Sequence, residues 1–314
     1  MENSSQTALS GATSSARATT SAGLEIFRKC REFTRAAEAR AAGLYPYFMP
    51  IEESHDTHVV INGEDKIMIG SNNYMGLTHD PRILEAAEKA LRKYGSGNTG
   101  SRFLNGNLDL HEQLEAELAD FVGMEEALVF STGYQTNLGT LGALLGRNDT
   151  VFVDKLDHAS IQDGVRLGLG QVRRFAHDDW ATLRRMLANE PAGRGLMIAV
   201  DGVYSMEGDI ADLPKLVELK HEFDAALLVD DAHAVGVIGE TGAGTAEYWG
   251  LTHEVDLILG TFSKSFASIG GFCAGRADVI DYLRNHARAL IFSASMPPAS
   301  VATVLKALEI IRTE

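Results

Sequence analysis

Residues 260–266 read Gly260-Thr-Phe-Ser-Lys-Ser-Phe266, and the pattern around them predicts the architecture of the chain. An apolar run over residues 255–260 leads into them, and its length and branched residues predict a buried strand over Asp256–Leu259. A second apolar run, Ala226–Val229, leads in the same way into Asp230-Asp-Ala-His233. Two buried strands therefore end in polar, chemically active residues, which makes an enzyme the first hypothesis.

Strands and helices alternate on both sides of these runs. This alternation predicts an α/β fold with a mostly parallel sheet covered on both faces, and ligands of such sheets lie beyond the carboxyl ends of the strands. The other expected strands are Ala127–Phe130, Thr150–Val153, Gln171–Phe175 and Leu196–Val200, and the expected helices are Pro81–Tyr94, Leu110–Phe121, Asn137–Leu145, Thr182–Asn189 and Leu213–Phe223.

The two ends of the chain have a different character. Residues 1–22 are rich in Ser, Ala and Thr and are expected to form a disordered tail, while Leu24–Arg40 predicts an amphipathic helix. The dipeptide Asn62-Gly63, between residues 59–61 and 66–70, predicts a hairpin turn. We therefore expect a tail (1–22), a helix and hairpin segment (23–75), a large cofactor-binding domain (76–300), and the start of a linker helix (301–314).

Composition excludes several classes of function. The net charge of −15, from 28 basic and 43 acidic residues, argues against nucleic acid or an anionic membrane as the main partner. No apolar run has the roughly 18–20 residues that a membrane helix needs. Cys30 and Cys273 are the only cysteines and lack metal-ligand spacing, so we expect a cytoplasmic protein without a disulfide framework or a metal.

The residues after the two strands fit pyridoxal 5′-phosphate. A lysine can form a Schiff base with this cofactor, an acid can keep its pyridinium nitrogen protonated, and hydroxyl groups can bind its phosphate. Asp230 and Asp231 point to opposite faces of a strand, so only one can meet the ring nitrogen, and we choose Asp230. Asp230, Asp231 and His233 could also bind a metal, but no second ligand cluster accompanies them.

Three further segments leave two interpretations open at the level of residues. Ser131-Thr-Gly-Tyr134 is either an ordinary strand-to-helix turn or a phosphate-binding helix start. His158 follows a strand and either stacks on a ring or packs as a helix cap. The glycine-rich run 95–102, which contains Arg102, is either a plain loop or a segment that wraps a substrate. Ser205 lacks the Gly-x-Ser-x-Gly elbow, so a serine hydrolase is not expected.

Together these segments resemble the α-oxoamine synthases, pyridoxal-phosphate enzymes of aminotransferase fold type I, from about Tyr45 to the end of the chain. The motifs that carry the resemblance are residues 71–77 (SNNYMGL), 95–106, 157–160 (DHAS), 230–233 (DDAH) and 260–264 (GTFSK). The phrases at 99–106, 130–135, 202–206 and 260–265 favour the branch that uses L-serine. The resemblance implies a three-layer α/β/α domain and the decarboxylative condensation of an amino acid with a long-chain acyl-CoA, giving a 3-ketosphinganine-type aminoketone.

The resemblance also implies a role for individual residues. Lys264 would be the Schiff-base lysine, Asp230 the partner of the pyridinium nitrogen, and His158 the group that stacks on the ring; these three are the expected catalytic residues. The other expected cofactor contacts are His233 to the phenolic oxygen, Gly133, Tyr134 and Thr261 to the phosphate, Ser205, and Ser293 and Ser295 in a segment that reaches a neighbouring subunit's phosphate. Ala294 stands where the family usually has threonine. Asn72 and Arg102 are the expected substrate-binding residues.

The resemblance further implies a homodimer with shared active sites and an acyl-CoA or acyl carrier protein as the acyl donor. Family members continue into a small C-terminal domain, whereas the helix that begins at Pro297-Pro298 is still running at Glu314. We therefore expect a fragment or a shortened homologue without that domain. Two alternatives stay open: a synthase that uses glycine or alanine, of the aminooxononanoate or aminoketobutyrate type, and a non-catalytic partner subunit.

Overall fold

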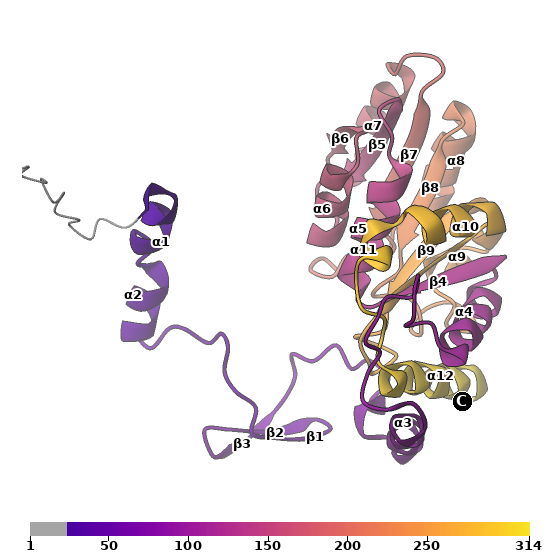
Figure 1. Cartoon of the computed structure of the whole chain (residues 1–314). Helices are drawn as coiled ribbons and strands as arrows, with labels where there is room; N and C mark the ends of the chain where they lie inside the picture. Colours follow the sequence, from indigo (N-terminus) through magenta and orange to yellow (C-terminus); the bar gives the residue numbers. More distant parts are fainter. Residues whose placement is uncertain (1–23) are drawn as a thin grey trace, which may run out of the picture. The chain divides into compact units, whose positions relative to one another are not determined.

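The computed structural model describes residues 24–314, so the expected tail over residues 1–22 lies outside the described residues (Figure 1). The chain divides into two compact units. One contains the residues up to Glu53 together with Val60–Glu64, and the other contains Ser54–Val59 and Asp65–Glu314. The division into domains at residues 75 and 300 stays a prediction.

The first unit holds short helices instead of the single expected helix over Leu24–Arg40. A 3-10 turn, η1 (Glu25–Phe27), runs into α1 (Arg28–Arg31), and α2 (Arg35–Ala41) follows after a break. The prediction of one helix was wrong because Phe27 and Phe33 remain exposed, and a helix that buries no apolar face gains too little to extend.

The predicted hairpin is confirmed. Asn62 and Gly63 have φ angles of 55° and 69°, as a tight two-residue turn requires. The turn joins β2 (His58–Ile61) to β3 (Glu64–Ile67), and β1 (Glu53–His55) completes a three-stranded sheet in the order β1-β2-β3.

The second unit is built on a seven-stranded sheet in the order β4-β10-β9-β8-β7-β5-β6 (Figure 1). Six strands run parallel, and β10 is antiparallel to both of its neighbours. The strands are β4 (Glu126–Phe130), β5 (Asp149–Asp154), β6 (Gln171–Phe175), β7 (Gly195–Asp201), β8 (Ala226–Asp230), β9 (Leu257–Thr261) and β10 (Gly271–Gly275). The mostly parallel α/β sheet predicted from the sequence is therefore confirmed.

Alternate residues of each strand are buried against opposite layers of helices. In β8, for example, Leu227 and Val229 belong to one hydrophobic cluster and Leu228 to the other. The first cluster also contains residues of α4 (Asp109–Val122), α7 (Trp180–Ala188), α8 (Leu213–Phe223) and α12 (Pro298–Thr313), and the second contains residues of α5 (Gly133–Leu144), α6 (Ala159–Leu167), α10 (Ala277–His286) and α11 (Arg288–Ile291). The three-layer α/β/α arrangement follows from this alternation.

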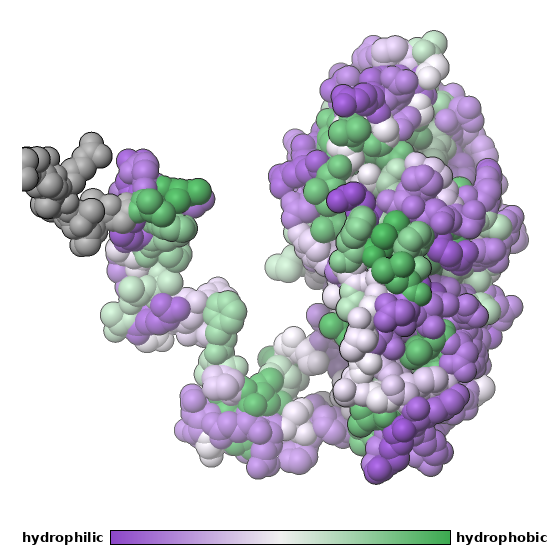
Figure 2. Space-filling model, viewed as in Figure 1, coloured by the Kyte–Doolittle hydropathy of each residue, from purple (hydrophilic) through white to green (hydrophobic). Residues whose placement is uncertain are grey.

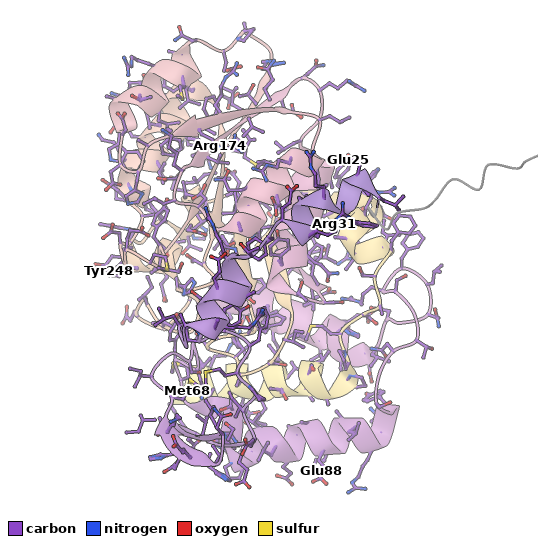
Figure 3. All side chains as sticks on the ribbon, turned by 90° about the vertical axis from the view of Figure 1, so that its left-hand side faces the viewer. Glu25, Arg31, Met68, Glu88, Arg174 and Tyr248 are labelled. Carbon is purple, nitrogen blue, oxygen red and sulfur yellow. The ribbon has the colours of Figure 1, made fainter. Side chains whose placement is uncertain are left out.

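The last helix packs inside the second unit. α12 lies beside α3 (Pro81–Tyr94) and α4, and it buries Val301, Val304 and Leu308 (Figure 1). The outer side of α3 carries exposed ion pairs, and Glu88 points away from α12 in Figure 3. The remaining short elements are η2 (Leu77–His79), α9 (Thr245–Tyr248) and η3 (Thr252–Glu254).

The face of the second unit that Figure 2 shows is mostly hydrophilic, with an apolar patch near α11. Phe292, which follows α11, is 72% exposed. Among residues 24–314, no helix has both the length and the apolar character needed to cross a bilayer.

Candidate active site

A pocket of about 390 Å³ lies beyond the carboxyl ends of β5, β7, β8 and β9, beside the first turn of α5. This is the edge of the sheet at which the sequence predicts a ligand. Eight of the ten expected cofactor residues line it: Gly133, Tyr134, His158, Ser205, Asp230, His233, Thr261 and Lys264. Segments that lie more than a hundred residues apart in the sequence thus meet in one pocket.

The Asp230 carboxylate is buried and held from two sides. One oxygen accepts a hydrogen bond from Asn137 Nδ2 at 2.6 Å, and the other accepts from the backbone N–H of Ala232 at 3.1 Å. Asn137 also donates to Ser160 Oγ at 2.9 Å, which fixes its amide in the helix α5. The carboxylate is therefore oriented before any ligand binds.

Asp231 has a different environment, as the alternation along a strand predicts. Its Oδ2 accepts from the backbone N–H of Thr245 at 2.8 Å, and its Oδ1 is buried without a hydrogen-bond partner among the described residues. Burial raises the pKa of Asp231 to about 7. Only Asp230 of this acidic pair lines the pocket.

Lys264 follows β9 and lines the same pocket as Asp230. Burial lowers the pKa of Lys264 from its ordinary value, while the nearby carboxylates of Asp230 and Asp201 act in the opposite direction. Within residues 24–314 the amine forms no hydrogen bond. Because burial increases the fraction of neutral amine, the side chain is suited to act as a nucleophile.

His233 contacts a tyrosine behind the pocket. Its Nδ1 lies 2.7 Å from the hydroxyl of Tyr74, which also lies 3.3 Å from Oδ1 of Asn72. Burial, together with the positive charges of Lys264 and His158, lowers the pKa of His233 to about 4. Asn72 does not line the pocket but reaches it through this pair of contacts.

His158 caps the start of α6. Its Nδ1 lies 2.7 Å from Ser160 Oγ, and its backbone N–H donates to Oδ2 of Asp201 at 2.8 Å. Asp157 in turn accepts from the backbone N–H of Asp201 at 3.0 Å. Burial raises the pKa of both carboxyls; the charge of Asp201 adds to the effect at Asp157, and the charge of Asp230 adds to it at Asp201. The histidine is thus both a helix cap and a pocket residue, so the two interpretations of the sequence are compatible.

The start of α5 lies against Thr261. A Cβ atom at Gly133 would lie 2.5 Å from Thr261 Oγ1, so only glycine fits there. Thr132 caps the helix by accepting from the N–H of Gln135, and the Thr261 hydroxyl donates to the carbonyl of Gly270. A helix start without bulk, next to a hydroxyl group, is a suitable place for a phosphate.

Ser293 and Ser295 lie outside the pocket lining. Ser293 accepts from Gln135 Nε2 at 3.1 Å, whereas Ser295 is buried and its hydroxyl donates to the carbonyl of Gly106 at 2.6 Å, with Gly100 O at 3.2 Å. In this chain, therefore, the hydroxyl of Ser295 binds residues 95–106, the glycine-rich segment. The carbonyls of residues 294 and 296 accept further bonds from Ser131, Asn98 and His111.

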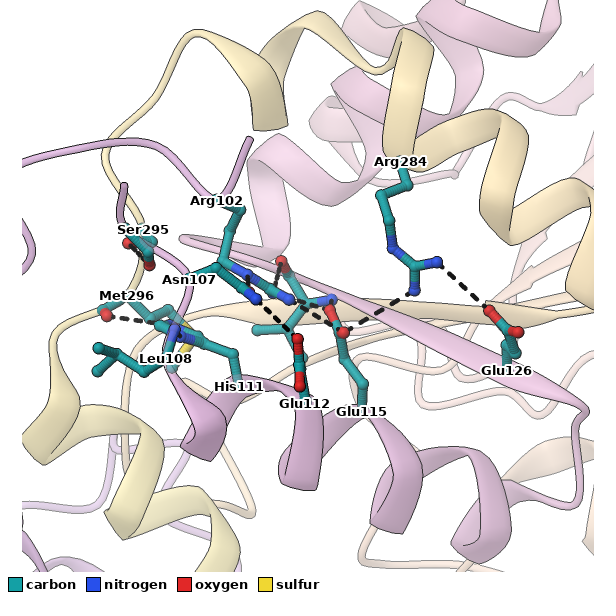
Figure 4. A network of polar contacts seen from close by, with 12 residues as sticks. Arg102, Asn107, Leu108, His111, Glu112, Glu115, Glu126, Arg284, Ser295 and Met296 are labelled. Atoms are coloured by element: carbon teal, nitrogen blue, oxygen red, sulfur yellow. Dashed lines mark hydrogen bonds and ion pairs between the residues drawn. The ribbon is translucent and has the colours of Figure 1, made fainter. Parts of the chain in front are cut away.

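Arg102 also lies outside the pocket (Figure 4). Its two terminal nitrogens bind the two carboxylate oxygens of Glu115 at 2.8 and 3.0 Å, and its Nε donates to Asn107. Both charged side chains are more than nine-tenths buried. The guanidinium of Arg102 is held in this ion pair. The two side chains border a separate cavity of about 820 Å³ between α4 and α10. The expected role of Arg102 in substrate binding gains no support from this geometry.

Sequence reasoning missed Asn137 and Asp201, which line the pocket, and Tyr74, which contacts His233 behind it. The signals were present. Asn137 is a polar residue one turn into a largely apolar helix, Asp201 ends a buried strand as Asp230 does, and Tyr74 belongs to the motif at 71–77. Their partners could not be read from the sequence, because each lies across the fold.

The chain is similar to proteins of known activity. Residues 64–313 match the family described as aminotransferase class I and II. A serine palmitoyltransferase of Sphingobacterium spiritivorum is 55% identical over 290 residues, which cover 92% of this chain and 73% of the relative. A solved structure of a serine palmitoyltransferase from S. paucimobilis, with a bound PLP–myriocin aldimine, is 38% identical with a TM-score of 0.88 and covers 92% of this chain and 72% of that one.

A second kind of relative is more distant. An 8-amino-7-oxononanoate synthase of Geotalea daltonii is 43% identical over 276 residues, which cover 88% of this chain and 70% of the relative. The family and the fold expected from the sequence are confirmed by these matches. The identities also rank the serine-using relative above the oxononanoate synthase.

Proposed function

The chain belongs to the aminotransferase class I and II family, and on this basis we propose that it catalyses the pyridoxal-phosphate-dependent condensation of L-serine with a long-chain acyl thioester. The products are carbon dioxide, the free thiol and a 3-ketosphinganine-type aminoketone. This reaction is the first step of sphingolipid synthesis, as the resemblance to the α-oxoamine synthases implies. One observation carries the proposal: an uncommitted lysine amine and a buried, oriented carboxylate share one pocket.

The residues of the pocket fit pyridoxal phosphate. Asp230 offers a buried carboxylate for a cationic ring nitrogen, and Lys264 offers an amine with no hydrogen-bond partner among the described residues. The space at Gly133, which a single methyl group would fill, lies at a helix start and beside the hydroxyl of Thr261. When bound, the cofactor supplies an aldehyde for the lysine and an electron-withdrawing ring next to the amino acid's Cα.

Individual side chains of the pocket have distinct roles in the proposed reaction. Lys264 Nζ would be the base that takes the Cα proton of the amino acid and later returns a proton to the product. Asp230 would hold a positive charge on the ring nitrogen of the cofactor, and Asn137 keeps the Asp230 carboxylate in place. His158 covers one face of the site, with Tyr134 edge-on at 6.5 Å between ring centres. The thioester carbonyl carbon bonds to Cα, the thiol leaves, and the carboxyl group departs as carbon dioxide.

The test is turnover by the purified protein loaded with pyridoxal phosphate. We expect L-serine and palmitoyl-CoA to give the aminoketone, seen by mass spectrometry, and one equivalent of free thiol. Lys264→Ala should lower turnover at least about 100-fold, the scale of losing a positioned base, and should abolish the visible absorbance of the covalently held cofactor. Lys89→Ala, on the exposed side of α3, is the control and should match the wild type.

A wild-type protein that neither takes up the cofactor nor makes product would contradict the proposal and favour a non-catalytic partner subunit. The similarity to the oxononanoate synthase makes a different amino acid the second candidate. Assays with glycine or alanine in place of serine distinguish the two candidate functions. Product from alanine but not from serine would indicate an oxononanoate-type synthase.

The acyl donor, the assembly and the location belong to the same proposal. We propose acyl-CoA as the acyl donor, and the turnover assay compares it with acyl carrier protein. A homodimer is supported by the resemblance and by large apolar side chains that remain exposed, at Phe103 (55%), Leu104 (78%) and Phe292 (72%). A cytoplasmic location is supported by the free thiols of Cys30 and Cys273.

A further inference from the structure

The hydroxyl of Tyr74 lies between two groups of the proposed site. It is 2.7 Å from His233 Nδ1 and 3.3 Å from Asn72 Oδ1, and the tyrosine and histidine rings lie 6.1 Å apart at a tilt of 50°. Tyr74 does not line the pocket itself, whereas His233 does. The tyrosine therefore acts on the pocket only through a neighbour.

The hydroxyl has one hydrogen to donate. Oδ1 of Asn72 can only accept, and Nδ1 of a neutral imidazole accepts when the ring hydrogen is on Nε2. The ring of His233 is neutral near pH 7, because burial and the charges of Lys264 and His158 lower its pKa to about 4. Burial also raises the pKa of Tyr74, so the phenol keeps its proton.

The distances assign that proton. The contact to His233 Nδ1 is 0.6 Å shorter (3.3 minus 2.7) than the contact to Asn72 and lies in the range of a strong hydrogen bond. With Nδ1 accepting from Tyr74, the ring hydrogen of His233 is on Nε2, the ring nitrogen that Tyr74 does not contact. Since His233 lines the pocket, its ring then offers a donor for an oxygen of the cofactor.

We propose that Tyr74 is a positioning residue that fixes the tautomer of His233 as Nε2–H. The inference rests on the proposed function, because the donor serves an oxygen on the cofactor.

The first test needs no cofactor. In the cofactor-free protein, ¹⁵N NMR of the histidine rings distinguishes protonated from unprotonated nitrogens, and His233→Gln assigns the signal. We expect Nε2 of His233 to carry the hydrogen in the wild type and a mixture of tautomers in Tyr74→Phe. Tyr282→Phe is the control, since this residue is equally exposed (44%) and stacks on His286 outside the pocket.

The second test uses the protein loaded with pyridoxal phosphate. Tyr74→Phe should shift the pH midpoint of the cofactor's visible absorbance and weaken L-serine binding about 10-fold, the scale of one lost hydrogen bond, while Tyr282→Phe changes neither. A wild-type ring with the hydrogen on Nδ1, or a Tyr74→Phe variant with an unchanged tautomer, would overturn the inference. A wild-type protein that binds no cofactor would instead refute the proposed function. The NMR experiment would still determine which ring nitrogen of His233 carries the hydrogen.

Discussion

Asp231 is a buried carboxyl group, and only one of its two oxygens has a hydrogen-bond partner among the described residues. Its pKa of about 7, against an ordinary value of 3.8, means that the folded protein holds a proton there that the unfolded chain releases. This contribution to the free energy of unfolding is fully present below pH 3.8 and is lost as the pH rises through about 7. Asp231 therefore makes stability fall with pH on the acidic side of neutrality.

Asp231→Asn should remove this dependence. The amide can still accept from the N–H of Thr245 and has no charge to bury. We expect the difference in the free energy of unfolding, wild type minus variant, to fall by about 1 kcal/mol per pH unit between about pH 5 and 6.5. Urea denaturation at several pH values measures it. Asp224→Asn, at an exposed position, is the control, and parallel curves for wild type and Asp231→Asn would contradict the assignment.

Single residues could be placed from the sequence when they follow a recognisable strand. Lys264, Asp230 and His233 stand at such ends, and parallel strands bring their ends together at one edge of the sheet. Ser295 and Arg102 could not be placed in this way, because their partners, Gly106 and Glu115, come from loops and helices whose packing has no local signal. Their assigned roles stay predictions that this geometry does not support.

At the scale of elements, the start of α5 has a tight steric limit at Gly133. Gly133→Ala would put a methyl group 2.5 Å from Thr261 Oγ1, where the phosphate of the cofactor is proposed to lie. We expect the affinity for pyridoxal phosphate to fall at least about 10-fold, since the helix start and the hydroxyl move apart. Equilibrium dialysis measures it.

The same helix offers a matched control. Gly142 also lies in α5, but the nearest atom to an added Cβ there is 3.4 Å away. Gly142→Ala should leave cofactor affinity unchanged and should stabilise the helix by up to about 1 kcal/mol, since alanine is the better helix former. Equal affinity of the two variants would show that the start of α5 does not hold the phosphate.

The long periodic elements were predictable, and the short ones were not. Pro81–Tyr94 and Leu213–Phe223 have the predicted bounds, because each has a proline in its first turn and a clear apolar period. β10 was missed: its residues, Gly271–Gly275, include two glycines and no β-branched residue, and it is held by burial of Phe272, Cys273 and Ala274 between β4 and β9. Tertiary packing, which a local pattern does not report, determines that strand.

At the scale of the whole molecule, one buried ion pair joins distant parts of the second unit. Arg102 comes from the glycine-rich segment and Glu115 from α4, and Glu115 also accepts from the backbone N–H of Val129 in β4 (Figure 4). The same glycine-rich segment binds the hydroxyl of Ser295 through the carbonyls of Gly100 and Gly106. The pair therefore supports a loop that holds residues 293–296 near the pocket.

Breaking this pair from one side should be costly. Glu115→Gln leaves the guanidinium of Arg102 buried without a counter-charge, and we expect the free energy of unfolding to fall by about 3–5 kcal/mol in chemical denaturation. Glu112→Gln is the matched control on the same helix: its partner is the amide of Asn107, glutamine can still accept that bond, and the change should stay within about 0.5 kcal/mol. Replacing both members, Arg102→Met with Glu115→Leu, should recover part of the loss because no charge then stays buried. A Glu115→Gln protein as stable as the control would show that the pair is not what anchors the glycine-rich segment.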